Sequence, residues 1–159
     1  MLANGVYTAN LTPLKEDYSV DFELLVEHCQ FLLDNGSTGL AVLGTTGEAN
    51  SFSLAERKEI LEQTIKGGIP SDKIMVGTGC CSLPETIELT SHAVSLGFGG
   101  ILMLPPFYYK SVEDSGILTY FDEVISAVGQ NGLRIYLYHF PKMSGISVSY
   151  THLTLPTKA

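Results

Sequence analysis

The segment Gly44-Thr45-Thr46-Gly47 combines groups that could hold a small anion. It follows an apolar run, Thr38–Leu43. The two glycines permit a tight turn, and the threonines offer hydroxyls and backbone N–H donors, a combination that suits a carboxylate or a phosphate. No Gly-Lys-Ser/Thr follows, so the segment is not a nucleotide-binding P-loop. The alternative is an ordinary turn in which the threonines cap the chain locally.

A second segment, Tyr138-His139-Phe140-Pro141, could move protons. It ends another apolar run, Arg134–Leu137. A tyrosine in this position can relay protons if a neighbour holds its hydroxyl, even though the pKa of a free phenol is about 10. The alternative is a core tyrosine with a satisfied hydroxyl. His139 alternates to the opposite side of the chain and is expected to pack rather than act as a base.

A third segment, Pro105-Pro106-Phe107-Tyr108-Tyr109, places aromatic side chains after an apolar run. These side chains could line a pocket or a subunit contact, or they could plug one end of a sheet. The four histidines have no metal-ligand spacing, and Cys80 and Cys81 are adjacent, so no metal site is predicted.

Alternating strands and helices must position these segments. Apolar runs predict strands that begin near residues 5, 39, 74, 101 and 134, and segments with helical periodicity separate them. Ser53 and Glu56 predict a capping box at the start of one helix, and Ser82 and Glu85 predict a second. The order β-α-β-α-β-α-β-α-β predicts a parallel sheet with helical crossovers.

Two folds fit this alternation. One is the first five strands of a (β/α)₈ barrel, whose units average about 31 residues. The other is a complete five-stranded doubly wound sheet. The pattern alone leaves both open. In either fold, chemistry is expected beyond the carboxyl ends of the strands, which is where the three segments lie.

Composition excludes several functions. The chain has 159 residues, of which 45% are hydrophobic and 16% charged, and its net charge of −8 would repel nucleic acid. An odd number of cysteines indicates a reducing compartment. No signal peptide is visible and no apolar run reaches the roughly 20 residues of a membrane span. We therefore expect a soluble cytoplasmic protein without a membrane or nucleic-acid partner.

Three stretches together resemble one family. "LAVLGTTGEANSFSLAERKEIL", "ILMLPPFYYK" and "YLYHFPKMSG" look like the dihydrodipicolinate synthase/N-acetylneuraminate lyase family of pyruvate-dependent class I aldolases. The resemblance runs from about residue 5 to residue 146. It implies a (β/α)₈ barrel, of which this chain carries the N-terminal (βα)₄β portion. It also implies catalysis through a Schiff base on pyruvate, without a separate cofactor, and a homotetramer for full-length relatives.

The resemblance assigns roles to matching residues. Thr46 and Gly47 would bind the pyruvate carboxylate, and Ser144 and Gly145 complete the substrate-binding set. Thr45 would hold the hydroxyl of Tyr138 and connect it to Tyr108, with Tyr109 as the alternative. Tyr138 would then shuttle protons during Schiff-base and aldol steps.

The Schiff-base lysine of the family has no counterpart in this chain. In the family it ends strand six, about 31 residues beyond Tyr138 and so past residue 159. None of the chain's seven lysines matches that position: Lys15, Lys58, Lys66, Lys73, Lys110, Lys142 and Lys158. We therefore expect a truncated, inactive family member. Residues 1–146 should form the partial barrel, and residues 147–159 an irregular tail that is not family sequence.

The residues after Pro141 bear on the substrate. Synthases of the family usually carry an arginine two positions after this proline, whereas this chain has Met143, preceded by Lys142. A methionine cannot pair with a carboxylate, and a lysine is a less rigid partner than an arginine. An aldolase that acts on a 2-keto-3-deoxy sugar acid or a similar compound is therefore favoured over a 4-hydroxy-tetrahydrodipicolinate synthase. The chain could instead have no catalytic function and serve in binding or assembly. The strands at the two edges of a partial barrel lack partners, and open sheet edges favour association between chains.

Overall fold

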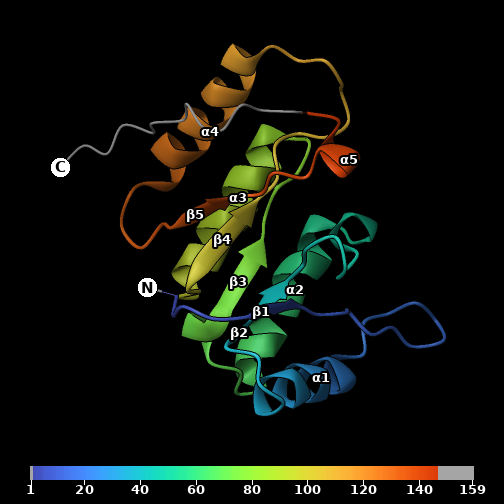
Figure 1. The fold of residues 1–159 in the computed structure, drawn as a ribbon. Helices are drawn as coiled ribbons and strands as arrows, with labels where there is room; N and C mark the ends of the chain where they lie inside the picture. The colour runs from blue at the N-terminus through green and yellow to red at the C-terminus, as the bar shows by residue number, and fades with distance from the viewer. Residues whose placement is uncertain (1, 147–159) are drawn as a thin grey trace.

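Five short strands form one parallel sheet. The computed structural model describes residues 2–146, and the predicted tail at residues 147–159 lies outside them. The strands are β1 (Tyr7–Ala9), β2 (Gly39–Val42), β3 (Ile74–Gly77), β4 (Gly100–Met103) and β5 (Ile135–Leu137). Their order in the sheet is the order in the sequence, and every pair is parallel (Figure 1). The strands lie within the predicted apolar runs but are shorter, so Tyr138 follows β5 directly.

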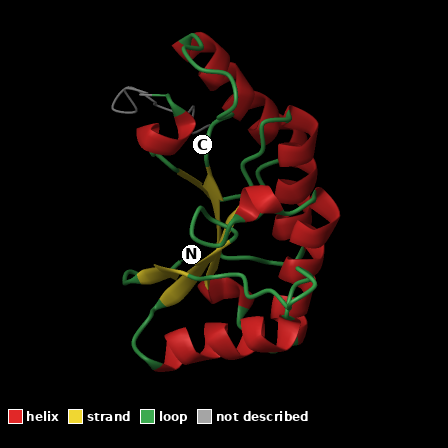
Figure 2. Ribbon diagram, turned by 90° about the vertical axis from the view of Figure 1, so that its right-hand side faces the viewer, coloured by secondary structure: helices red, strands yellow, loops and turns green. Residues whose placement is uncertain are grey.

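Four long helices cover one face of the sheet (Figure 2). They are α1 (Phe22–Asp34), α2 (Leu54–Lys66), α3 (Leu83–Ser95) and α4 (Asp114–Val128). Two short 3₁₀ helices (Ala49–Ser51 and Ser71–Lys73) and a four-residue helix, α5 (Pro141–Ser144), complete the described elements.

The strand order distinguishes the two predicted folds. A doubly wound sheet reverses its strand order at a switch point and carries helices on both faces. Here the order is consecutive and the long helices share one face, which is the arrangement of a (β/α)₈ barrel. The prediction of a (βα)₄β barrel portion is confirmed, and the doubly wound alternative is excluded.

The core lies between the sheet and its helices. Each long helix turns apolar residues at helical spacing toward strand residues that are themselves inaccessible to solvent. Burying one such leucine, isoleucine or phenylalanine stabilises the fold by roughly 1.5–3 kcal/mol. The largest of the fully buried side chains are Phe121, Leu25, Leu40, Leu43, Ile60 and Leu61.

One of the two predicted capping boxes is present. The hydroxyl of Ser53 accepts from the Glu56 amide at 3.3 Å, and the Glu56 carboxylate accepts from the Ser53 amide at 2.8 Å. The prediction of a second box at Ser82 was wrong, because the Ser82 side chain makes no capping hydrogen bond. Pro84 removes one amide that such a serine could accept from. The Ser82 carbonyl, rather than its side chain, has a polar neighbour here, the hydroxyl of Thr86 at 3.2 Å.

Among residues 2–146, no helix is both long enough and apolar enough to span a membrane.

Candidate functional site

The turn after β2 is held in an uncommon backbone conformation. Leu43 and Glu48, the residues on either side of Gly44–Gly47, have φ values of 56° and 52°. Non-glycine residues seldom occupy this left-handed region, and each such residue costs about 1 kcal/mol or more. The loop after β1 holds the turn in place, because the hydroxyl of Thr12 donates to the Gly47 carbonyl at 2.8 Å. Strain of this kind gathers at binding and catalytic sites.

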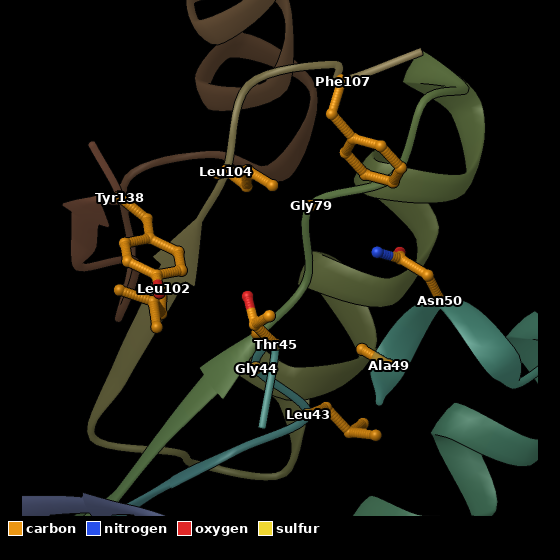
Figure 3. A pocket seen from close by; sticks show the side chains of 11 residues that line it. Leu43, Gly44, Thr45, Ala49, Asn50, Gly79, Leu102, Leu104, Phe107 and Tyr138 are labelled. Carbon is orange, nitrogen blue, oxygen red and sulfur yellow. The ribbon is translucent and has the colours of Figure 1, made fainter. Parts of the chain in front are cut away.

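A narrow cavity lies beyond the carboxyl ends of β2, β3, β4 and β5 (Figure 3). Its volume is about 30 Å³, room for one or two water molecules. Thr45 approaches it from the turn after β2, and Tyr138 approaches it from the end of β5. The structure therefore brings together two residues that are 93 positions apart, although their hydroxyls are not hydrogen-bonded to each other. The other lining residues are Leu43, Gly44, Ala49, Asn50, Gly77, Gly79, Leu102, Leu104 and Phe107.

Larger hollows lie elsewhere. One of about 430 Å³ lies between α1 and α2, and one of about 460 Å³ lies beside the loop after β1. Neither is lined by a residue with a predicted catalytic or substrate-binding role. The narrow cavity is the candidate site because of its hydroxyl groups and its position at the strand ends, although it is smaller than these hollows.

Glycines allow the strand ends to approach one another at this cavity. A Cβ atom at Gly77 would lie 2.0 Å from the carbonyl oxygen of Leu43, and one at Gly79 would lie 2.6 Å from that of Leu104. Only glycine permits backbones to come so close. The Gly-Thr-Gly sequence at residues 77–79 was thus a readable signal for this wall of the cavity that the sequence analysis did not use.

The loop after β4 places a different aromatic residue at the cavity from the one predicted. Phe107 lines it, whereas the side chain of Tyr108 is 72% exposed and does not. The ring of Tyr108 packs edge-on against that of Tyr109, with 5.1 Å between ring centroids. Within this chain, Tyr108 is therefore not brought to Thr45 and Tyr138.

The remaining predicted residues are in distinct surroundings. Within the turn after β2, Thr46 is exposed and Gly47 is buried. Ser144 is only 1% exposed, and its hydroxyl proton can be accepted by either of two carbonyls, that of Phe140 at 3.2 Å or that of Ile146 at 3.3 Å. Gly145 has φ 68° and ends α5. None of these four residues lines the cavity.

Asn50 is a polar lining residue that the sequence analysis missed. Figure 3 shows its amide on the side of the cavity opposite Tyr138. Its signal was its position, because it lies in the same segment as Thr45, only three residues beyond Gly47. Asn50 adds both a donor and an acceptor to a site whose other lining side chains are mostly apolar.

A buried cation lies behind the β3 wall. The guanidinium of Arg57 donates to the carbonyl of Gly77 at 2.9 Å and to the sulfur of Cys80 at 3.1 Å. Burial raises the pKa of the Cys80 thiol, and the nearby Arg57 charge opposes that rise. Among residues 2–146, no cluster of three or more His, Cys, Asp or Glu side chains is arranged to hold a metal ion.

Comparison with known proteins matches these features to one family. A family model described as "Dihydrodipicolinate synthetase family" matches residues 2–155. A relative named "Uncharacterized DapA-like lyase" from Chloroflexus aurantiacus is 40% identical over 148 residues, which is 92% of this chain and 49% of the relative. N-acetylneuraminate lyase from Rattus norvegicus is 30% identical over 146 residues, 91% of this chain and 45% of that protein.

A solved structure agrees with the sequence relatives. The crystal structure of dihydrodipicolinate synthase from Agrobacterium tumefaciens superposes with a TM-score of 0.89 at 32% identity, covering 92% of this chain and 51% of that one. The chain thus spans about half the length of the curated relatives it matches.

Proposed function

The chain belongs to the dihydrodipicolinate synthetase family, and from this membership we propose that it carries part of the active site of a Schiff-base-forming aldolase. The substrates proposed are pyruvate and an aldehyde, as in carbon–carbon lyases of the class I aldolase type. The observation that carries the proposal is that Thr45 and Tyr138 line one cavity at the carboxyl ends of the strands.

In the proposed site, the turn after β2 receives the carboxylate of pyruvate. Thr46 and Gly47 supply its donors, and Thr45 orients the hydroxyl of Tyr138. The hydroxyls of Thr45 and Tyr138 approach the cavity from different strands, so a single polar group of a substrate bound at its mouth can lie between them. Tyr138 then passes a proton to and from the reacting oxygen. Tyr108 would join this relay only after the loop after β4 turns it inward, or from a neighbouring copy.

The lysine that forms the Schiff base is proposed to lie outside the described residues. The lysine must sit at the cavity and be neutral to attack the keto group of pyruvate. No lysine of residues 2–146 lines the cavity. Lys58 forms an ion pair with Glu88 on the helical face, and Lys73 precedes β3, at the opposite end of that strand. Lys158 lies outside the described residues.

Among the possible aldehydes, we favour one that gives a 2-keto-3-deoxy sugar acid. Met143 stands where synthases of the family usually carry an arginine, and its side chain is half exposed. Neither it nor Lys142 offers the planar, bidentate donor that an arginine would give to a second carboxylate. The competing function is that of 4-hydroxy-tetrahydrodipicolinate synthase.

A chimeric barrel tests the proposed function. Residues 1–146 are joined to the C-terminal half of an N-acetylneuraminate lyase, which supplies a Schiff-base lysine. Borohydride with pyruvate should trap a covalent adduct on the chimera and none on the 159-residue chain. Tyr138→Phe in the chimera should lower the cleavage rate by about 10²–10⁴-fold, and the matched change Tyr18→Phe, at an exposed tyrosine with no predicted role in the site, should leave it nearly unchanged.

Three outcomes would contradict the proposed function. An adduct on the 159-residue chain would place a reactive lysine within it, and a folded chimera that traps no pyruvate would remove the aldolase function. Condensation of aspartate semialdehyde at a rate equal to or above cleavage of 2-keto-3-deoxy sugar acids would overturn the substrate preference.

A second candidate function, as an assembly fragment, is favoured by the sheet edges. β1 and β5 each pair with only one strand of the described sheet, and two apolar or aromatic side chains at these strands are exposed, Val6 just before β1 and Tyr136 within β5. Such edges template strand pairing between chains. Sedimentation of the 159-residue chain should show association that rises with concentration, and a monodisperse monomer at all concentrations would count against this candidate.

A further inference from the structure

Lys110 connects the loop after β4, which carries Phe107, to helix α5, which follows Tyr138. Phe107 and Tyr138 both line the cavity. The ammonium of Lys110 donates to the carbonyl of Ser144 at 3.0 Å and to that of Met143 at 3.4 Å, both at the end of α5. It also donates to the carbonyl of Phe107, in its own loop. Figure 1 shows α5 beside the loop that joins β4 to α4. All three N–H donors of the Lys110 ammonium are therefore used.

Gly145 lies against the side chain of Lys110, where a larger residue would not fit. Its φ of 68° lies in the left-handed region that glycine adopts most readily. A Cβ atom at this position would lie 2.5 Å from Cδ of Lys110, so the lysine chain runs directly over the glycine. Gly145 therefore has two reasons to lack a side chain, and both concern the junction between the loops.

Helix α5 depends on contacts from outside itself. It has four residues, too few for a helix to be stable alone. The last carbonyls of a helix have no partner within it. Lys110 supplies donors to two of them, and a positive charge at the carboxyl end of a helix is favourable. Without this lysine, the carbonyls of Met143 and Ser144 would turn to water and α5 would open more often.

Phe140, at the start of α5, links the helix that Lys110 holds to the ring of Tyr138. The Phe140 carbonyl accepts from the amides of Met143 and Ser144, each at 3.0 Å. The ring of Phe140 in turn packs against that of Tyr138, with 5.5 Å between centroids. On the other side of the junction, the ammonium fixes the carbonyl of Phe107, whose ring lines the same cavity.

We propose that Lys110 is a positioning residue of the site, one that sets the place of the Tyr138 ring by tying α5 to the loop after β4. This inference rests on the proposed function for its catalytic meaning. The placement of Tyr138 can be measured on the 159-residue chain without any activity. A failed chimera and a failed placement are therefore separate results.

The test uses the 159-residue chain labelled with 3-fluorotyrosine and compares three variants. Lys110→Met removes the ammonium but keeps an unbranched side chain. Lys110→Arg restores a cation with several donors. Lys142→Met makes the same chemical change within α5 itself, at an exposed lysine for which the structure shows no hydrogen bond or ion pair among residues 2–146. The readouts are amide hydrogen exchange at Gly145 and Ile146 and the ¹⁹F resonance of Tyr138, assigned with Tyr138→Phe.

In Lys110→Met, exchange at Gly145 and Ile146 should be about tenfold faster or more, and the Tyr138 resonance should move toward that of free fluorotyrosine. Lys110→Arg should recover both readouts, and Lys142→Met should change neither. If Lys110→Met does not fold by circular dichroism, Lys110→Gln replaces it with the same expectations. Unchanged exchange, an equal change in Lys142→Met, no recovery in Lys110→Arg, or faster exchange with an unmoved Tyr138 resonance would each overturn the proposal.

Discussion

The guanidinium of Arg57 lies 3.1 Å from the sulfur of Cys80, in a part of the core from which water is excluded. Arg57 is only 4% exposed, and its Nε atom has no hydrogen-bond partner. Among the described residues, its charge is not paired with a carboxylate. Buried charges are rarely left this way, because removing an ion from water without a counter-ion is costly. The contacts with Cys80 and with the Gly77 carbonyl are therefore the main compensation for burying this cation.

From this arrangement we predict that Arg57→Met is tolerated better than Arg57→Lys. Arg57→Met removes two hydrogen bonds and should lower the free energy of unfolding by about 1–2 kcal/mol. Arg57→Lys keeps a buried charge, but the ammonium is more strongly hydrated than a guanidinium and cannot reach both acceptors with a planar fork. The free energy of unfolding should therefore fall further in Arg57→Lys. Urea unfolding measures both. Lys58→Met, on the next residue of α2, is the control and should cost less than about 1 kcal/mol. A lysine variant more stable than the methionine variant would contradict the prediction.

Tyr120 and Thr86 form the second half of this buried network. Their hydroxyls lie 2.6 Å apart, and the Tyr120 hydroxyl also donates to the Cys80 carbonyl at 3.1 Å. We expect Tyr120→Phe to lower the free energy of unfolding by roughly 1–3 kcal/mol, because it leaves buried polar atoms with fewer partners. Tyr109→Phe, at an exposed tyrosine, should change it by less than about 0.5 kcal/mol. A double-mutant cycle with Thr86→Val measures the coupling, and additive losses would show that the two hydroxyls act independently.

The two serines at helix starts should respond differently to the same substitution. Ser53→Ala removes a complete capping box and should cost about 1 kcal/mol, whereas Ser82→Ala should cost less than about 0.5 kcal/mol because its side chain caps nothing.

Hydrogen bonds from the Ser53 side chain and backbone lower the pKa of Glu56 below its usual 4.5. The carboxylate's part of the cap is therefore present above that pH and is lost as the pH falls through the lowered pKa. Thermal melts of both variants at neutral and acidic pH test this, and equal losses at neutral pH would refute it.

Cys29 should make the fold less stable in alkali. Burial raises the pKa of its thiol from 9.0 to about 11. Between these values the unfolded chain loses the proton and the folded chain keeps it. The stabilising contribution is therefore complete below pH 9 and falls as the pH rises toward 11. Under reducing conditions, Cys29→Ala should lower the free energy of unfolding at pH 8 but flatten its decline above pH 9. Cys81→Ala, which removes an exposed cysteine, should leave the decline as in the unchanged chain. A Cys29→Ala chain with the same decline would assign it to other groups.

Several features of this protein could be predicted from the sequence because they are local. Apolar runs and helical periodicity located the five strands and four long helices, since each pattern depends on neighbours within a few residues. The capping box at Ser53 was visible for the same reason. Placing Thr45 and Tyr138 at one end of the sheet required only the rule that parallel strands share their carboxyl edge. The choice of a barrel came from the family resemblance, because strand and helix alternation fits two folds equally well.

Other features were decided only by the tertiary structure, because they depend on contacts between segments far apart in the sequence. The sequence does not reveal that Phe107 rather than Tyr108 faces the cavity, since this depends on how the loop after β4 leaves the sheet. Arg57 looks like an exposed helix residue until α2 packs over the end of β3 and buries it. Lys110 looks like a solvated loop residue until α5 comes within reach, 34 positions later. In each case the side chain's neighbours are set by the register and packing of the sheet, which no local pattern encodes.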